Sequence, residues 1–224
     1  REVLAGNVAA AIFGGDLVLT GDSLANDITV TRSGASGITI AGNGTTINGQ
    51  AAVTLNNFRR HLTVNLNGGD DTVTFKSTFD NLFTILGNLH VDTAGGNDKV
   101  NFADATVKGL LFVNTGSGND QVNGIEGFTG WSLRADGVAS ILTGSGNDVV
   151  SLNRARFAKT ASILLEKDQD DLFLSNSFFL KTNVHNGGLG QDRLDVVNTA
   201  FSKRPIVVLF ESRGSNPPPT TNIP

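Results

Sequence analysis

The stretch Gly116-Ser117-Gly118-Asn119-Asp120-Gln121-Val122 decides the fold that this sequence predicts, because variants of it recur along the chain. Each variant contains a glycine, any residue, an aspartate, any residue and an apolar residue, although the copy at Asp171 is degenerate. The aspartates of the six copies are Asp71, Asp98, Asp120, Asp148, Asp171 and Asp192. Successive aspartates are 27, 22, 28, 23 and 21 residues apart. Such regular recurrence indicates a repeat protein.

Apolar residues also recur at fixed distances from these aspartates. Two residues after them stand Val73, Val100, Val122, Val150, Phe173 and Leu194. Seven residues before them stand Val64, Val91, Val113, Ile141, Leu164 and His185, and nine before the first three stand Leu62, Leu89 and Leu111. Alternation of apolar and polar residues predicts strands with one buried face. Each unit is therefore interpreted as a strand, a Gly-Asp corner, a second strand and a variable return.

A unit of this length cannot bury its apolar face alone, whereas stacked units bury a continuous interior. We therefore predict an all-β fold, a single-stranded right-handed parallel β-helix (solenoid) of about seven or eight coils of roughly 21–28 residues. A β-sandwich is the alternative, but it does not require one corner motif at one coil length. Asn26 occupies the aspartate position of an earlier copy, and Ile38, Ile40 and Ile47 predict one further coil before Asp71.

The domain organisation follows from the extent of the repeat. We expect a β-helix domain over residues 1–214, with an N-terminal cap or first coil in 1–25 and a last strand or cap in 200–214. Residues 215–224 contain Pro217-Pro218-Pro219 and are expected to be a Pro-rich tail or linker. A linker there predicts a monomeric domain within a longer chain.

Composition excludes several classes of function. The net charge of −4 argues against nucleic-acid binding, which needs many Lys and Arg residues. The longest apolar runs, such as Val8 to Phe13, are too short to span a membrane. The absence of Cys excludes disulfides. The 14 Phe residues without a Tyr indicate aromatic side chains chosen for a dry interior.

The corner motif resembles the hemolysin-type, or RTX, calcium-binding repeat G-G-x-G-x-D-x-U-x, in which U is apolar. Gly187-Gly188-Leu189-Gly190-Gln191-Asp192-Arg193-Leu194-Asp195 matches throughout, and the copies at Asp120 and Asp148 match from the second glycine onward. The chain is also similar to β-helical repeats of large surface and secreted bacterial proteins. The resemblance implies an extracellular or cell-surface setting. RTX nonapeptides are contiguous, however, whereas these copies are solitary.

Stacked corners would place a row of carboxylates about 4.8 Å apart, so their charges need compensation. Ca²⁺ at the corner residues Asp71, Asp98, Asp120, Asp148 and Asp192 would supply it, because Ca²⁺ takes six to eight oxygen ligands and Gly-rich corners expose backbone carbonyls beside the aspartates. The alternative is that each carboxylate accepts hydrogen bonds from corner N–H groups. Both alternatives stay open from the sequence.

Other residues suggest further roles. A polysaccharide lyase or hydrolase would need clustered acids and bases, for which the candidates are Asp168, Asp170 and Asp171, or Arg59, Arg60 and His61. The repeat places no two acids as an acid/base pair at a defined separation. Thr93, Thr115 and Thr143 share one column, which would suit ice binding if they were exposed. Trp131 would either cover the core or mark a contact patch.

We therefore expect a non-enzymatic structural or adhesive module of a secreted or surface bacterial protein, with calcium at the corners as an option. Its partner would be a cell-surface or glycan ligand that the sequence does not identify. A polysaccharide-acting enzyme is the alternative.

Overall fold

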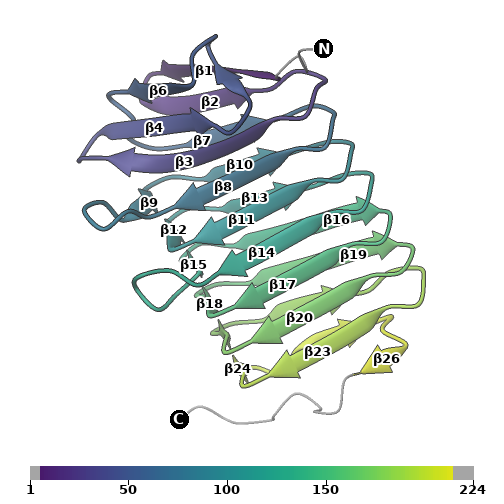
Figure 1. Cartoon of the computed structure of the whole chain (residues 1–224). Coiled ribbons are helices and arrows are strands. Elements are labelled where there is room, and N and C mark those ends of the chain that lie inside the picture. Colours follow the sequence, from purple (N-terminus) through teal and green to yellow (C-terminus); the bar gives the residue numbers. More distant parts are fainter. Residues whose placement is uncertain (1–5, 214–224) are drawn as a thin grey trace.

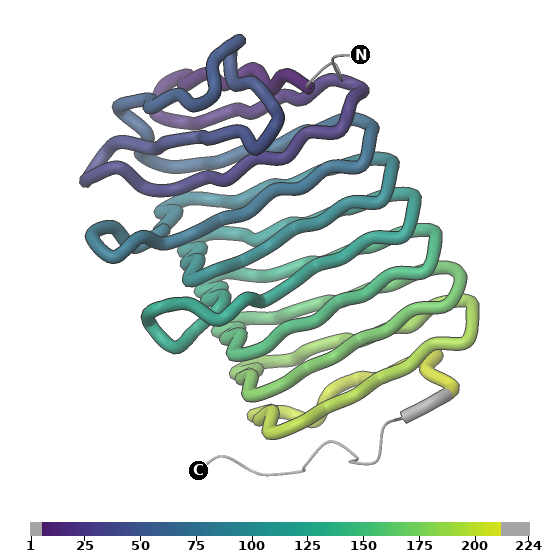
Figure 2. The backbone as a smooth tube through the Cα atoms, viewed as in Figure 1, coloured from purple at the N-terminus to yellow at the C-terminus, as the bar shows by residue number. Residues whose placement is uncertain are grey.

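The chain winds as a right-handed stack of β-coils, and in the computed structural model this stack comprises residues 6–213 (Figures 1 and 2). The chain passes from one end of the stack to the other in sequence order, so coils that follow each other in sequence lie side by side (Figure 2). The predicted all-β parallel β-helix is confirmed. The expected Pro-rich tail, 215–224, lies outside the described residues.

Three sheets run along the stack, and each coil contributes a strand to each of them in the regular region. The first sheet contains the parallel strands β2 (Asp16–Thr20), β7 (Leu62–Asn65), β10 (Leu89–Asp92), β13 (Leu111–Asn114), β16 (Ala139–Ser145), β19 (Ala161–Lys167), β22 (Asn183–Asn186) and β25 (Ile206–Val208). The second contains β3 (Asp27–Ser33), β8 (Thr72–Lys76), β11 (Lys99–Ala103), β14 (Gln121–Ile125), β17 (Val149–Asn153), β20 (Asp171–Ser175), β23 (Arg193–Val197) and β26 (Ser212–Arg213). The third contains the short strands β9 (Phe83–Ile85), β12 (Ala105–Val107), β15 (Leu133–Ala135), β18 (Ala155–Phe157), β21 (Phe178–Phe179) and β24 (Ala200–Phe201).

The N-terminal end is closed by antiparallel strands. Strand β1 (Asn7–Phe13) folds back on β2, and β4 (Gly37–Gly42) folds back on β3. Strands β5 (Thr46–Ile47) and β6 (Ala52–Leu55) complete this cap. The prediction of a further parallel coil between Asn26 and Asp71 is therefore wrong. Its isoleucines are buried as predicted, but they lie in the cap strands β4 and β5, which cover an otherwise open sheet edge.

Apolar columns fill the interior because equivalent positions of successive coils pair in register. Leu62, Leu89 and Leu111 form one such column, as the alternation predicted. Phe157, Phe179 and Phe201 form another, with stacked rings 4.7 and 5.1 Å apart between centroids. Burial of these continuous columns supplies the main driving force for stacking coils that are unstable singly.

No helix in residues 6–213 is long and apolar enough to cross a membrane.

Candidate functional site: the Gly-Asp corner

The corner between the first and second sheets carries a column of buried aspartates. The backbone N–H of each corner residue donates to the carboxylate of the corner residue in the next coil. These bonds join Asn26 to Asp71, Asp71 to Asp98, Asp98 to Asp120, Asp120 to Asp148, Asp148 to Asp170, and Asp170 to Asp192, at N···O distances of 2.7 to 2.9 Å. We call this column the Asp ladder. At most 2% of the surface of each of these residues is exposed.

In this coil the ladder residue is Asp170, whereas the sequence motif was aligned on the next residue, Asp171. The register pairs Val150 with Leu172, so Asp171 stands one position further on, at the start of β20. The spacing along the ladder is therefore 27, 22, 28, 22 and 22 residues from Asp71 onward. Two consecutive aspartates left the alignment ambiguous by one residue, and such a slip exchanges the two faces of a strand.

The same slip affected two apolar positions of this coil. Leu172 and Ile163 occupy the buried columns, in place of the expected Phe173 and Leu164. Phe173 and Leu164 instead point outward, where each is half-buried.

The ladder has distinct ends. At its start, the Asn26 amide donates to Asp22 and to the Leu24 carbonyl oxygen. At its other end, Glu211 replaces the aspartate: its Oε2 accepts from the Asp192 N–H at 2.7 Å, and its own N–H donates back to the Asp192 carbonyl oxygen at 3.1 Å. The Glu211 N–H is thereby used in a bond back to the preceding coil, so Glu211 ends the ladder within residues 6–213.

A second ladder runs beside the first on the outside of the corner, in the opposite direction. Here the N–H of each residue donates to the side chain of the preceding coil. The bonds join Asn97 to Asp70, Asn119 to Asn97, Asn147 to Asn119, and Gln169 to Asn147, at 2.7 to 3.0 Å. We call this column the Asn ladder. This role of the asparagines was not predicted, although the Asn-Asp pair that recurs at 97–98, 119–120 and 147–148 was a signal for it in the sequence.

The corner glycines allow the coils to approach closely. Gly118 has a φ of +128°, and a Cβ placed on it would lie 1.8 Å from the Gly96 carbonyl oxygen. Gly96 and Gly146 occupy equivalent positions with the same contact to the coil before them. Only glycine fits a positive φ and this spacing together.

Burial controls the charge of the Asp ladder. Desolvation raises the pKa of Asp71 and of Asp170 to about 8, against an ordinary value of 3.8. The Oδ2 atom of each is buried and has no hydrogen-bond partner among the described residues. A proton on that oxygen removes the cost of burying the charge.

In the middle coils, threonines partly offset the rise in the pKa of the ladder carboxyls. Thr93 and Thr143 stand five residues before Asp98 and Asp148, and their nearby hydroxyl groups lower the pKa of these carboxyls against the effect of burial. Burial still raises the pKa of Asp98 and Asp148, but only to about 6. Leu66 and Leu165 occupy the equivalent positions before Asp71 and Asp170, where no hydroxyl offsets the desolvation.

The threonine column is interior, which contradicts the ice-binding alternative. Thr93, Thr115 and Thr143 are fully buried. Each hydroxyl also reaches the backbone carbonyl oxygen of the next coil, at 3.0 to 3.1 Å. An interior column offers no surface to ice.

The candidate catalytic groups do not form an acid/base pair. Asp170 is buried in the ladder, whereas Asp168 is exposed and accepts from the Gly146 N–H at 3.1 Å. At the other cluster, Arg60 forms an exposed ion pair with Asp16 at 3.1 Å. His61 accepts from the Asn88 N–H through Nδ1 at 2.9 Å.

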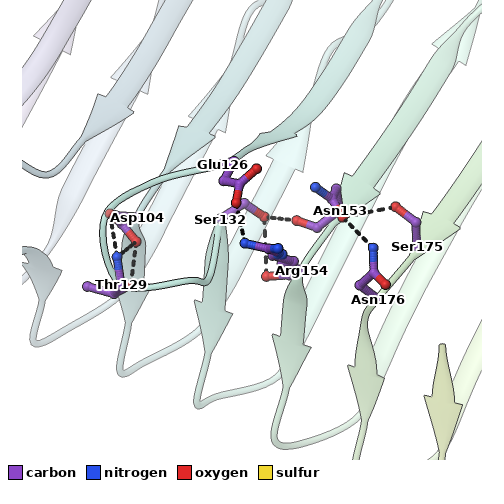
Figure 3. A network of polar contacts seen from close by, with 8 residues as sticks. All are labelled: Asp104, Glu126, Thr129, Ser132, Asn153, Arg154, Ser175 and Asn176. Carbon is purple, nitrogen blue, oxygen red and sulfur yellow. Dashed lines mark hydrogen bonds and ion pairs between the residues drawn. The ribbon is translucent and has the colours of Figure 1, made fainter. Parts of the chain in front are cut away.

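A cleft of about 310 Å³ lies beside the loop that joins β14 to β15. Its lining residues are Lys76, Ser77, Ala103, Asp104, Glu126, Gly127 and Phe128. Figure 3 shows that both of its carboxylates hold the loop in place: Asp104 accepts from the Thr129 N–H and hydroxyl, and Glu126 forms an ion pair with Arg154. Both carboxylates are thus engaged with neighbouring donors.

His185 is more deeply buried than expected for a polar residue at a fraying last coil. It pairs between Ile163 and Val207, and its ring packs edge-on against Phe179 at 5.3 Å. Neither ring nitrogen has a hydrogen-bond partner among the described residues, and burial lowers the pKa of His185 to about 4. The side chain is therefore neutral at physiological pH.

Calcium at Asp71, Asp98, Asp120, Asp148 and Asp192 stays a prediction. The carboxylates stand in single file along the stack, and one oxygen of each accepts a backbone N–H. Within residues 6–213, no three His, Asp or Glu side chains converge as a group that could hold a metal ion.

No protein-family model matches the sequence, and no curated protein or solved structure is significantly similar to it.

Proposed function

We propose that this chain is a non-catalytic structural module, a stiff β-helical spacer of a secreted or surface-attached bacterial protein. The observation that carries the proposal is the unbroken Asp ladder from Asn26 to Glu211, which ties every coil to the next. The Asn ladder adds bonds of the opposite direction at the same corner. The secreted or surface setting rests on the resemblance of the corner motif to RTX repeats.

Stiffness follows from the placement of these bonds. Sheet hydrogen bonds hold strands together, but a bend between strands is normally the weakest part of a coil. Here the Asp ladder bonds the bend through side chains whose surroundings are dry, so these hydrogen bonds do not compete with water. Local opening of one corner would expose several buried polar groups at once.

Amide hydrogen exchange tests this property. We expect the corner amides of Asp71, Asp98, Asp120, Asp148 and Asp170 to exchange as slowly as the amides of the central strands. Fast exchange at these corners, with slow exchange in the strands, would contradict a stiff spacer.

The alternative, a polysaccharide-acting enzyme, is tested in parallel. We expect no new reducing ends or unsaturated products after incubation with a panel of neutral and acidic polysaccharides. Turnover that is lost in Glu126→Gln would overturn the non-catalytic proposal.

Calcium is a second candidate for stabilising the corners, since the partnerless Oδ2 atoms of Asp71 and Asp170 call for either a proton or a cation. Thermal unfolding distinguishes a bound cation from a proton. It is measured after chelation and then with millimolar calcium or magnesium. A midpoint raised by calcium alone supports the metal, because a ligand of the native state stabilises it by mass action. An unchanged midpoint supports the proton.

A further inference from the structure

Cationic side chains gather along the third sheet and the corner that follows it, on the side of the coil away from the Asp ladder. We call this set the basic strip: Lys108, Arg134, Arg156, Lys159, Lys181, Lys203 and Arg204. They come from the segments 105–110, 133–138, 155–160, 178–183 and 200–205, in which Asp136 is the sole acidic residue. The strip is thus positive on a protein whose net charge is −4.

The register of the third sheet aligns these cations in two rows. Arg134 pairs directly with Arg156 in adjacent strands, and both side chains point outward. Lys159, Lys181 and Lys203 each stand two residues after a member of the stacked Phe157, Phe179 and Phe201 column. They therefore occupy one corner position of three successive coils, and all three are exposed.

Most of this positive charge is not compensated within residues 6–213. Asp136 accepts from Lys108 Nζ at 2.6 Å and from Arg156 Nη1 at 3.1 Å. Arg134 Nε is buried without a hydrogen-bond partner among the described residues. The three stacked lysines form no ion pair in that part of the chain.

Two aromatic rings stand beside the cations. Phe178 follows Arg156 in the outward column of the third sheet and is 36% exposed. Trp131 packs edge-on against it, with ring centroids 5.5 Å apart. Of the two roles considered for Trp131, the structure thus favours the contact patch, because its partner lies on the outer face.

We propose that the basic strip binds a linear anionic polysaccharide along the axis of the stack, a role beyond the spacer function and independent of it. One coil rises about 4.8 Å, close to the length that one pyranose adds to an extended chain. A sugar with one carboxylate or sulfate per residue can therefore meet one cation per coil. Arg pairs with such oxyanions in bidentate fashion, and the Trp131 and Phe178 rings offer faces to pyranose C–H groups.

The shape of the strip argues against other polyanions. Duplex DNA carries about one charge per 1.7 Å of axis and needs a broader and denser basic surface. A membrane surface would need a wide face, whereas the strip is one narrow sheet and one corner.

The test is equilibrium binding of the purified chain to polygalacturonate, dextran sulfate, neutral dextran and duplex DNA. We expect both anionic glycans to bind at low salt, neutral dextran not to bind, and DNA to bind more weakly than the glycans. Tighter binding of polygalacturonate assigns a carboxylated ligand, and tighter binding of dextran sulfate assigns a sulfated one. No glycan binding, or DNA binding of equal strength, would overturn the proposal.

A pair of matched variants locates the site. Replacing Lys159, Lys181 and Lys203 together by Gln should weaken glycan binding by roughly tenfold or more and reduce its salt dependence. Replacing Lys76, Lys99 and Lys167 by Gln makes the same change of charge away from the strip, and should alter affinity less than about twofold. Circular dichroism verifies that both variants fold. Equal losses in the two would show that only net charge matters, and would overturn the assignment.

Discussion

The backbone N–H of Asp98 donates to Oδ1 of Asp120 at 2.8 Å, across 22 residues of sequence and one coil of the stack. At the neighbouring position, the N–H of Asn119 donates in the opposite direction to Oδ1 of Asn97, at 2.9 Å. Two adjacent residues thus bond one coil to its neighbour in both directions. At the corner, where strand pairing is reduced to isolated bridges such as Gly95 with Ser117, these side-chain bonds add to the backbone bonds between coils.

Removing one member of the Asp ladder should therefore destabilise the fold. Asp120→Ala leaves the buried N–H of Asp98 without an acceptor, so we expect a loss of about 1–3 kcal/mol in the free energy of unfolding. Asp120→Asn keeps the acceptor oxygen and should cost less. Chemical denaturation measures both, with Gln121→Ala on the outer face as a control. Equal effects of the Ala and Asn variants would show that the hydrogen bond is not the cause.

The threonines should set the pKa of the ladder carboxyls. Thr143→Val removes the hydroxyl from Asp148, and we expect the pKa of Asp148 to rise from about 6 toward the value of about 8 found for Asp170. The reciprocal change, Leu165→Thr, should lower the pKa of Asp170. Carboxyl ¹³C chemical shifts followed through a pH titration measure both values. Unchanged titrations would mean that burial alone determines them.

Stability should decrease as the pH rises toward alkaline values. The folded state keeps protons on Asp71 and Asp170 with a pKa of about 8, whereas the unfolded chain releases them near 3.8. Their contribution is complete below pH 3.8 and is lost as the pH rises through about 8. Thermal unfolding between pH 6.5 and 9 should show a falling midpoint, and Asp71→Asn with Asp170→Asn should flatten it. A midpoint that rises over this range would contradict protonated ladder carboxyls.

The contribution of His185 to stability should have the opposite dependence on pH. Its pKa falls from 6.5 to about 4 on folding, so its neutral form stabilises the native state above pH 6.5 and this stability is lost as the pH falls toward 4. His185→Leu removes two buried nitrogens that have no hydrogen-bond partner among the described residues, and we expect a gain of about 1 kcal/mol in the free energy of unfolding at pH 7, with a weaker decline in acid. Denaturation at pH 7 and pH 5 tests this. A variant less stable at both values would show that His185 contributes packing that leucine cannot replace.

The glycine column should tolerate no side chain. Gly118→Ala combines a φ of +128° with a Cβ 1.8 Å from the Gly96 carbonyl oxygen, so we expect a loss above about 3 kcal/mol or failure to fold. Gly34→Ala, at a φ of +69° with no atom within 4 Å of the new Cβ, isolates the effect of backbone strain and should cost about 1 kcal/mol. Similar losses in the two variants would mean that coil contact at Gly118 is unimportant.

The fold was largely predictable because its periodicities are carried by side chains that must be buried. Leu62, Val64 and Val73 identify two strands of a coil, and the Gly-Asp motif identifies the bend between them. The third sheet was not predicted, since its strands have only two or three residues and no motif marks their corners. The segment between Asn26 and Asp71, which includes the hairpin of β3 and β4, was mistaken for a further coil because antiparallel and parallel strands share the same alternation.

The corner was predicted from the sequence, which left its chemistry open between calcium and hydrogen bonds from corner N–H groups. The aspartates of five copies were identified, but a sequence does not show whether a side chain at a bend turns inward or outward. That direction makes the carboxylates acceptors for buried N–H groups. The basic strip was missed because Lys159, Lys181 and Lys203 share no local motif and align only once the register is known.

The equivalence of the inner corners has a consequence for how such a gene changes over generations. In every such coil, the ladder aspartate donates its backbone N–H to the next coil and accepts a backbone N–H from the preceding coil through its carboxylate. Unequal recombination that duplicates or deletes one whole coil therefore leaves no inner corner donor or acceptor unmatched. The length of the molecule can be inherited as a number of copies, while the two specialised ends stay unaltered.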